Sequence, residues 1–134
     1  MIEKTLSIIK PDAVERNLVD DIKSIFAKNN LSIKNSKKIH ISKEEASEFY
    51  KVHQSKPFYD ALCSYLSSGP ILVMILEGEN AISENRKIMG ATNPKDAEPN
   101  TIRKLYGISI DKNSVNGSDS LENAKKEINF FFKN

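Results

Sequence analysis

The chain has 134 residues, of which 39% are hydrophobic and 28% are charged, and its formal net charge is +2. This length suits a single domain with one core, covering residues 1–134. The small net charge gives no argument for a nucleic-acid or membrane-surface partner. A lone cysteine, Cys63, excludes an internal disulfide and fits a reducing compartment.

The N-terminal residues 1–5 lack the basic start and apolar run of a signal peptide. No apolar segment approaches the roughly 20 residues that a membrane-spanning helix needs. We therefore expect a cytoplasmic protein. Cys63 lies among apolar residues on a predicted helix, which indicates a buried structural thiol rather than a nucleophile.

The first third of the chain predicts a strand, a helix and a second strand. Residues 5–9 form a short apolar run typical of an interior strand, and Pro11 ends it because proline lacks a backbone N–H. Lys10 is therefore placed at the end of this strand. Apolar residues recur at helical spacing from 18 to 26. The apolar residues between 31 and 41 all have odd numbers, as expected for a strand that buries one face.

The middle of the chain predicts two helices followed by a central strand. Ser42 and Glu45 have the spacing of a capping box, which opens the first helix. The second helix begins near Pro57 and ends before residues 69–70, a Gly-Pro pair. The continuous apolar run 71–76 is best interpreted as a central strand.

The last third predicts a short helix over 81–89, a mostly polar loop over 90–113, and a final helix. A loop of this length in a small domain is typical of a functional or a disordered segment. Asp119 and Glu122 have the spacing of a capping box for the final helix. Its apolar stripe comprises Leu121, Ala124, Ile128 and Phe131. The order of elements predicts an α+β sandwich, with helices packed on an antiparallel or mixed sheet.

Several common sites are excluded by the sequence. The five glycines fit neither the GxxxxGK[ST] nor the GxGxxG pattern, so side-chain cations and hydroxyls would have to bind any phosphate. His40 and His53 are the two histidines. No spacing of histidine, cysteine and acidic residues resembles a metal cage or a Ser-His-Asp triad.

A series of ordered segments resembles the nucleoside diphosphate kinase family. The most specific is 113–119, Asn-Ser-Val-Asn-Gly-Ser-Asp, which is similar to the family signature Asn-x-x-His-Gly-Ser-Asp. The others are 7–13, 49–50, His53, 57–58, 68–70, 76–78, 85–86, 89–92 and 101–103. The likeness covers nearly the whole chain.

The resemblance implies a ferredoxin-like α+β fold, with helices packed on a four-stranded antiparallel sheet. It implies transfer of the γ-phosphate of ATP to nucleoside diphosphates by a ping-pong route through phosphohistidine. It also implies Mg²⁺ bridging the nucleotide phosphates, and a homo-oligomer, either a tetramer or a hexamer.

The resemblance assigns the base and the ribose to three residues. Phe58 would stack on the base, since an aromatic face tolerates any base. Lys10 and Asn113 would reach the ribose hydroxyls, and Lys10 would also reach the phosphate being transferred. From the residues alone, core packing of Phe58 and a solvated strand end at Lys10 remain alternatives.

The resemblance assigns the phosphates to a second group, in which guanidinium forks match phosphate oxygens: Arg86, Thr92 and Arg103. A surface ion pair is the alternative for each arginine. Further residues resemble the family's supporting shell: Tyr50, Ser118 and Glu127. Glu127 would orient the nucleophile, as a carboxylate fixes the tautomer of an imidazole.

Asn116 departs from the family pattern, because it stands where the family has its phosphorylated histidine. A neutral imidazole nitrogen is nucleophilic near pH 7, whereas the lone pair of an amide nitrogen is delocalised into its carbonyl. His53 resembles a family histidine near the nucleotide cleft rather than the nucleophile. We therefore expect a chain that binds nucleotides and transfers little or no phosphate.

Three functions compete at this point. The first is a nucleoside diphosphate kinase disabled by one substitution, and the second is a natural nucleotide-binding scaffold or regulatory protein. The third is a nucleic-acid-binding module, because ferredoxin-like sheets often serve that purpose. The third needs a basic face with aromatic residues on strands, whereas the aromatic residues here lie mostly on predicted helices.

Overall fold

The computed structural model describes residues 1–110 and 112–132. At its centre is an antiparallel sheet with the strand order β2-β3-β1-β4. The strands are β1 (Ile2–Ile9), β2 (Ser32–Ile39), β3 (Ile71–Glu79) and β4 (Val115–Gly117). This arrangement confirms the predicted α+β class and the four-stranded antiparallel sheet.

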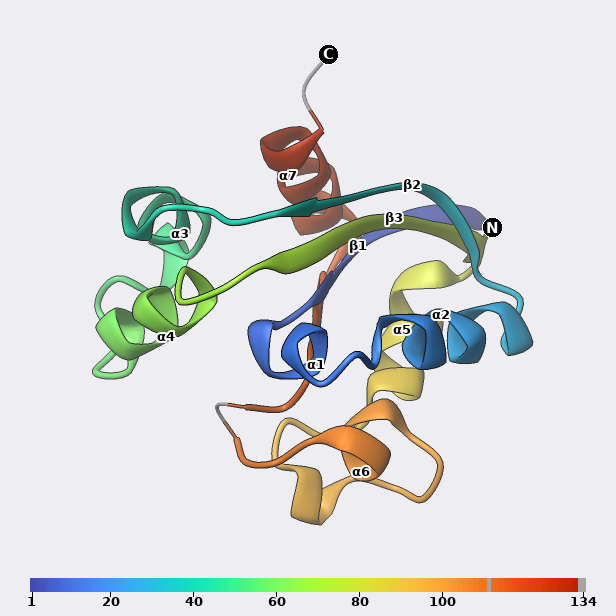
Figure 1. Ribbon diagram of the computed structural model, residues 1–134. Helices are drawn as coiled ribbons and strands as arrows, with labels where there is room; N and C mark the ends of the chain where they lie inside the picture. The colour runs from blue at the N-terminus through green and yellow to red at the C-terminus, as the bar shows by residue number, and fades with distance from the viewer. Residues whose placement is uncertain (111, 133–134) are drawn as a thin grey trace.

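Helices cover both faces of the sheet, as Figure 1 shows. They are α1 (Pro11–Glu15), α2 (Val19–Lys28), α3 (Lys43–Phe49), α4 (Tyr59–Leu66), α5 (Ala81–Met89), α6 (Ile102–Tyr106) and α7 (Leu121–Phe131), with 3₁₀ turns η1 (Lys51–His53) and η2 (Pro94–Asp96). In this view α2 and α5 lie to one side, α3 and α4 to the other, and α6 with its loops extends below the sheet.

The sheet separates two apolar cores. Met74 and Ile9 face the first core, where they meet Phe26 of α2 and Ile88 of α5. The second core contains Leu6, Ile8, Ala46, Cys63, Leu66, Val73 and Phe131. Alternate residues of β1 and β3 thus serve opposite faces, which requires both strands to be interior. The buried, unpaired Cys63 confirms the prediction of a structural thiol.

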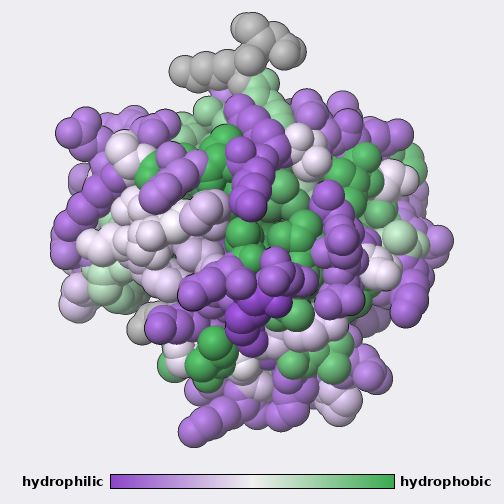
Figure 2. Space-filling model, viewed as in Figure 1, coloured by the Kyte–Doolittle hydropathy of each residue, from purple (hydrophilic) through white to green (hydrophobic). Residues whose placement is uncertain are grey.

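The surface in Figure 2 is mostly polar. Polar residues, in purple, form most of its outline, and apolar residues, in green, show near the middle of the face. Within the described residues, no helix has the length and apolar character to cross a membrane.

The prediction that the apolar residues between 31 and 41 all lie on one face of the second strand is wrong. Leu31 and Ile33 pack with the first core, whereas Ile39 and Ile41 pack with the second. The cause is a register shift against β3 between Ile33 and Asn35. A bulge adds one residue to one strand, and one extra residue moves every later side chain to the opposite face.

The predicted cap of the last helix is also wrong. Ser120, not Asp119, is the N-cap, because its hydroxyl accepts a hydrogen bond from the backbone N–H of Asn123. Asp119 instead accepts from the side-chain amide of Asn123, at 2.6 Å. Both acceptors suit a helix N-terminus, so the spacing rule selected the wrong one of two neighbours.

The predicted loop 90–113 contains more structure than its polarity suggested. It holds η2 and α6, and Ile102 of α6 is buried in the first core. Thr101 caps α6 by accepting from the N–H of Lys104. Asp111 lies outside the described residues.

The capping box at the start of α3 is confirmed and can be tested. Ser42 Oγ accepts from the N–H of Glu45, and Glu45 Oε1 accepts from the N–H of Ser42, both at 3.0 Å. We expect Ser42→Ala to lower the free energy of unfolding by about 1 kcal/mol, because it leaves an N-terminal donor without its acceptor. Urea unfolding followed by circular dichroism measures the loss.

Ser47→Ala is the matched control within the same helix. Its hydroxyl donates back to the carbonyl of Lys43, a contact that adds little to helix stability. Equal stability of the Ser42→Ala variant and the parent would contradict the role given to the box.

Candidate functional site

The residues singled out by the sequence gather around β4, the short outer strand of the sheet. Val115, Asn116 and Gly117 pair with Ile9, Ile8 and Ser7 of β1. Backbone bonds extend the pairing at both ends: the N–H of Lys10 donates to Ser114 O, and the N–H of Ser118 donates to Leu6 O. This ladder places residues 113–118 beside the end of β1.

Asn116 lies half-buried in the middle of β4. Its side-chain amide Nδ2 donates to the hydroxyl of Tyr50, at 3.2 Å. Tyr50 is 6% exposed, and burial is the main cause that raises the pKa of its phenol, so the hydroxyl stays protonated at neutral pH. The side-chain amide of Asn116 is therefore in direct contact with Tyr50.

Ser118 and Glu127 form a pair next to this position. The buried Ser118 hydroxyl donates to Glu127 Oε1 at 2.8 Å and accepts from the N–H of Leu6 at 3.3 Å. Burial raises the pKa of Glu127, and the hydrogen bond from Ser118 acts in the opposite direction. Glu127 thus holds the strand after Asn116 through Ser118, a more indirect contact than the nucleophile-orienting role predicts.

Lys10 is buried, so the alternative of a solvated strand end is wrong. It is 5% exposed, and its Nζ donates to Asn113 Oδ1 at 2.9 Å. Asn113 in turn donates from Nδ2 to the carbonyl of Thr92, at 3.0 Å. This chain of contacts connects the end of β1, the segment before β4 and the loop before η2.

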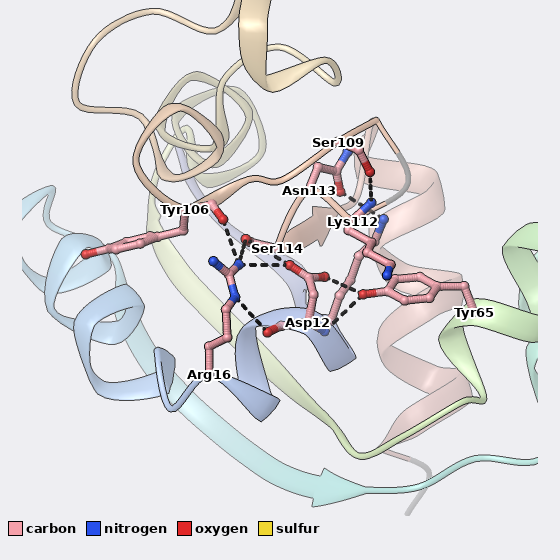
Figure 3. Close-up of polar contacts among 9 residues, drawn as sticks. Asp12, Arg16, Tyr65, Tyr106, Ser109, Lys112, Asn113 and Ser114 are labelled. Carbon is pink, nitrogen blue, oxygen red and sulfur yellow. Dashed lines mark hydrogen bonds and ion pairs between the residues drawn. The ribbon is translucent and has the colours of Figure 1, made fainter.

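A network that the sequence did not reveal anchors the same segment (Figure 3). The buried carboxylate of Asp12 accepts from the hydroxyl of Tyr65 at 2.6 Å, and from Ser114 and the guanidinium of Arg16 at 3.2 Å each. Ser114 has a φ of 76°, which is costly for a residue with a side chain. The bond to Asp12 helps to hold this strained residue beside Asn113.

Arg103 is also buried, so the surface ion pair considered for it is wrong. Its Nη1 donates to Gly90 O at 3.0 Å and its Nη2 donates to Val115 O at 2.9 Å. Burial, followed by the charge of Arg86, lowers the pKa of Arg103 to about 10. The side chain remains cationic at neutral pH, and its carbonyl partners hold it without neutralising it.

Arg86 completes a group of cations around β4. It lies on α5 and is exposed. Its charge contributes to lowering the pKa of Asp119, although the hydrogen bond from Asn123 is the larger cause. Its charge also contributes to lowering the pKa of Arg103, so Arg86 acts electrostatically on both Arg103 and Asp119.

Phe58 is 50% exposed, so the core-packing alternative is wrong. It lies at the start of α4 with its ring centroid 6.2 Å from that of His53. The His53 ring lies 6.3 Å from Tyr50, and its buried Nδ1 has no hydrogen-bond partner among the described residues. Phe58, His53 and Tyr50 thus form a row of rings leading toward Asn116.

The assembled group has cations, an exposed aromatic ring and hydroxyls, which together suit a flat ring joined to an anionic group. Of the described residues, no group of three histidine, cysteine, aspartate or glutamate side chains is placed to hold a metal ion. Asp119 and Glu127, two acidic side chains that follow β4 in the chain, are bonded to Asn123 and Ser118.

Comparisons with known proteins match the chain over nearly its whole length. A model of nucleoside diphosphate kinases matches residues 3–134. The chain is 56% identical over 131 residues to a nucleoside diphosphate kinase of a Nitratiruptor species, covering 98% of this chain and 96% of that relative. It is 54% identical over 133 residues to one of Nitrosococcus oceani, covering 99% and 93%.

Solved structures are similar over the same length. The nucleoside diphosphate kinase of Aquifex aeolicus superposes with a TM-score of 0.97 at 40% identity, covering 99% of this chain and 96% of the other. That of Encephalitozoon cuniculi superposes with a TM-score of 0.95 at 38% identity, covering 98% and 90%.

The burial of Glu127 predicts a pH-dependent stability. Because its pKa is higher in the folded than in the unfolded chain, folding takes up a proton between the two values, and stability falls as pH rises through that window. Glu127→Gln has no charge to bury and keeps an oxygen that accepts from Ser118. We expect the variant to gain stability relative to the parent as pH rises from about 4 to about 7.

Urea unfolding at both pH values measures this difference. Glu122→Gln, on an exposed part of the same helix, is the matched control for removing one negative charge. A relative gain that does not grow with pH would show that Glu127 ionises without cost in the folded chain.

Proposed function

Because the chain belongs to the nucleoside diphosphate kinase family, we propose that it binds nucleoside di- and triphosphates around β4. The reaction that the family resemblance implies is transfer of the γ-phosphate of ATP to a nucleoside diphosphate. In this chain we propose that the transfer is lost or severely impaired. The observation that carries the second part is Asn116 at the position of the family's phosphohistidine.

The binding half of the proposal is supported by the surroundings of β4. The exposed Phe58 ring is available to stack on a base, and Lys10 and Asn113 stand together as partners for the ribose hydroxyls. Arg86 and Arg103 supply two positive charges for the phosphates. Thr92 adds an exposed hydroxyl on the loop that Asn113 holds.

The loss of transfer follows from the chemistry of an amide. A ping-pong route needs a side chain that attacks the γ-phosphorus and then releases it to the next nucleotide. The Nδ2 of Asn116 has no available lone pair, and its hydrogen bond to Tyr50 is that of a donor. Removing the nucleophile of a covalent mechanism costs on the order of 10⁶-fold in a well-studied protease.

Mg²⁺ enters this proposal as a partner of the nucleotide. It prefers oxygen ligands, keeps several waters, and in phosphate-transferring enzymes is held largely by substrate phosphates. When bound there it neutralises phosphate charge. The lack of a carboxylate cage among the described residues fits that mode of binding.

We extend the proposal to assembly and location: a homo-oligomer, either a tetramer or a hexamer, in the cytoplasm. Large apolar side chains are exposed on and after α6, namely Leu105, Ile108 and Ile110, at 50%, 59% and 54%. Apolar surface of this kind is typical of contacts between subunits.

The second candidate is a natural nucleotide-binding scaffold or regulatory protein. Asn116 supports this candidate as well as it supports a kinase disabled by one substitution. Both candidates bind nucleotide, so they differ in whether the parent gene encodes asparagine at 116. The nucleic-acid module loses its support, because helices cover both faces of the sheet and its four described strands contain no aromatic residue.

A single-turnover experiment with γ-³²P-labelled ATP tests the loss of transfer. We expect the parent chain to retain almost no label and Asn116→His to become labelled within one turnover, because histidine restores a nucleophile next to Tyr50. Rapid labelling of the parent, comparable to that of the variant, would overturn the proposal.

The role of Phe58 predicts a loss of affinity. Stacking of a base on an aromatic ring contributes about 1–3 kcal/mol, so Phe58→Ala should weaken ADP binding by roughly 5- to 150-fold. Isothermal titration measures the change. Ile2→Ala serves as the control, because it removes an exposed apolar side chain at the end of β1 that lies away from Lys10. Unchanged affinity in Phe58→Ala would place the base elsewhere.

A further inference from the structure

We propose that Asn116–Gly117 is a self-modification site, at which the folded chain converts the Asn116 amide to a carboxylate. Base from the alkaline buffer takes the proton of the Gly117 backbone nitrogen, which attacks Cγ of Asn116 and forms a C–N bond. The bond from Cγ to Nδ2 breaks, and Nδ2 takes a proton from water and leaves as ammonia. Water then opens the cyclic imide to give aspartate or isoaspartate. The inference does not depend on nucleotide binding.

A hydrogen bond holds the Gly117 nitrogen next to the Asn116 amide. The N–H of Gly117 donates to Oδ1 of the preceding Asn116, at 3.1 Å. The nitrogen is thus kept near the carbonyl group whose carbon it would attack. Holding two groups in such proximity removes much of the entropy cost of bringing them together.

The sheet leaves this nitrogen free of ladder bonds. The N–H of Lys10 donates to Ser114 O, and the N–H of Ser118 donates to Leu6 O. Hydrogen-bonded positions alternate along an antiparallel pair, so Asn116 is the next bonded position and the N–H of Gly117 points away from β1. Because β4 is the outermost strand, no further strand takes up that N–H.

Residue 117 has no side chain to shield its nitrogen, and nothing larger fits there. A Cβ at Gly117 would lie 2.5 Å from Nδ2 of Asn85 and 3.0 Å from Cε of Met89. The packing therefore keeps glycine after Asn116, the least hindered residue for ring closure. Asn116 itself is half-buried, which leaves a route for water to the imide.

The departing nitrogen has a protonated neighbour. Nδ2 of Asn116 lies 3.2 Å from the hydroxyl of Tyr50. Burial raises the pKa of the Tyr50 phenol, so the hydroxyl keeps its hydrogen. It can donate a hydrogen bond to Nδ2 once that nitrogen regains its lone pair in the tetrahedral intermediate.

A second asparagine supplies an internal comparison. The N–H of Ser36 donates to Oδ1 of Asn35 at 2.9 Å, on the exposed strand β2. This hydrogen bond is of the same type as that between Gly117 and Asn116, but Ser36 carries a side chain. Among the described residues, no tyrosine hydroxyl is hydrogen-bonded to the Asn35 amide. If the glycine and Tyr50 matter, Asn116 reacts before Asn35.

The product would place a negative charge next to Val115, whose carbonyl Arg103 holds. If the proposed function is right, the ligand there is itself anionic, and one added charge near its phosphates should weaken ADP binding by at least about tenfold. The modification would thus lower nucleotide affinity without a second protein.

Peptide mapping by mass spectrometry tests the proposal on the intact protein. The folded chain and the same chain in guanidinium are incubated side by side in mildly alkaline buffer, and every asparagine is followed for the mass gain of one deamidation. Asn116→Asp provides the standard for the product. Asn116→Gln provides the control, because its ring closure is less favourable.

We expect Asn116 to convert first in the folded chain, and at least as fast as in guanidinium. Conversion that is about tenfold slower in the folded chain, equal to a barrier higher by about 1.4 kcal/mol, would show that the fold protects the amide and would overturn the proposal. Conversion of Asn35 ahead of Asn116 would overturn it as well. Neither result depends on whether ADP binds.

Discussion

The antiparallel pairing of β4 with β1 is the interaction on which the site depends. The bonds from Lys10 N–H to Ser114 O and from Ser118 N–H to Leu6 O fix both ends of a very short strand. Without them, Asn116 would have no defined position relative to Tyr50. A strand of three residues contributes few ladder bonds, so side chains must supply the remaining restraint.

That restraint comes from polar groups buried around the strand. Arg103 holds the Val115 carbonyl, and Ser118 connects the strand to Glu127 of α7. Asp12 holds the strained Ser114 through a bond between residues 102 positions apart. Burying polar and charged groups is costly unless they are bonded. The hydrogen bonds of these groups offset that cost and fix the arrangement of cations and hydroxyls around the strand.

How much could be predicted depended on the range of the interaction. The Ser42–Glu45 box and the apolar run in β3 are local, and the sequence predicted both. The bulge in β2 could not be predicted, because it exists only in the pairing with β3. The burial of Arg103 and the partners of Asp12 depend on contacts between distant segments, which periodicity cannot reveal. The family resemblance selected the residues that gather at β4, but not the bonds among them.

We propose that the residues around β4 are arranged for a nucleotide but lack the ring that would accept the phosphate. A crystal structure of the chain soaked with ADP and Mg²⁺ tests this proposal. We expect the base on the ring of Phe58 and the phosphates beside Arg86 and Arg103, pointing toward Asn116. ADP bound away from Phe58 and Arg103 would contradict it.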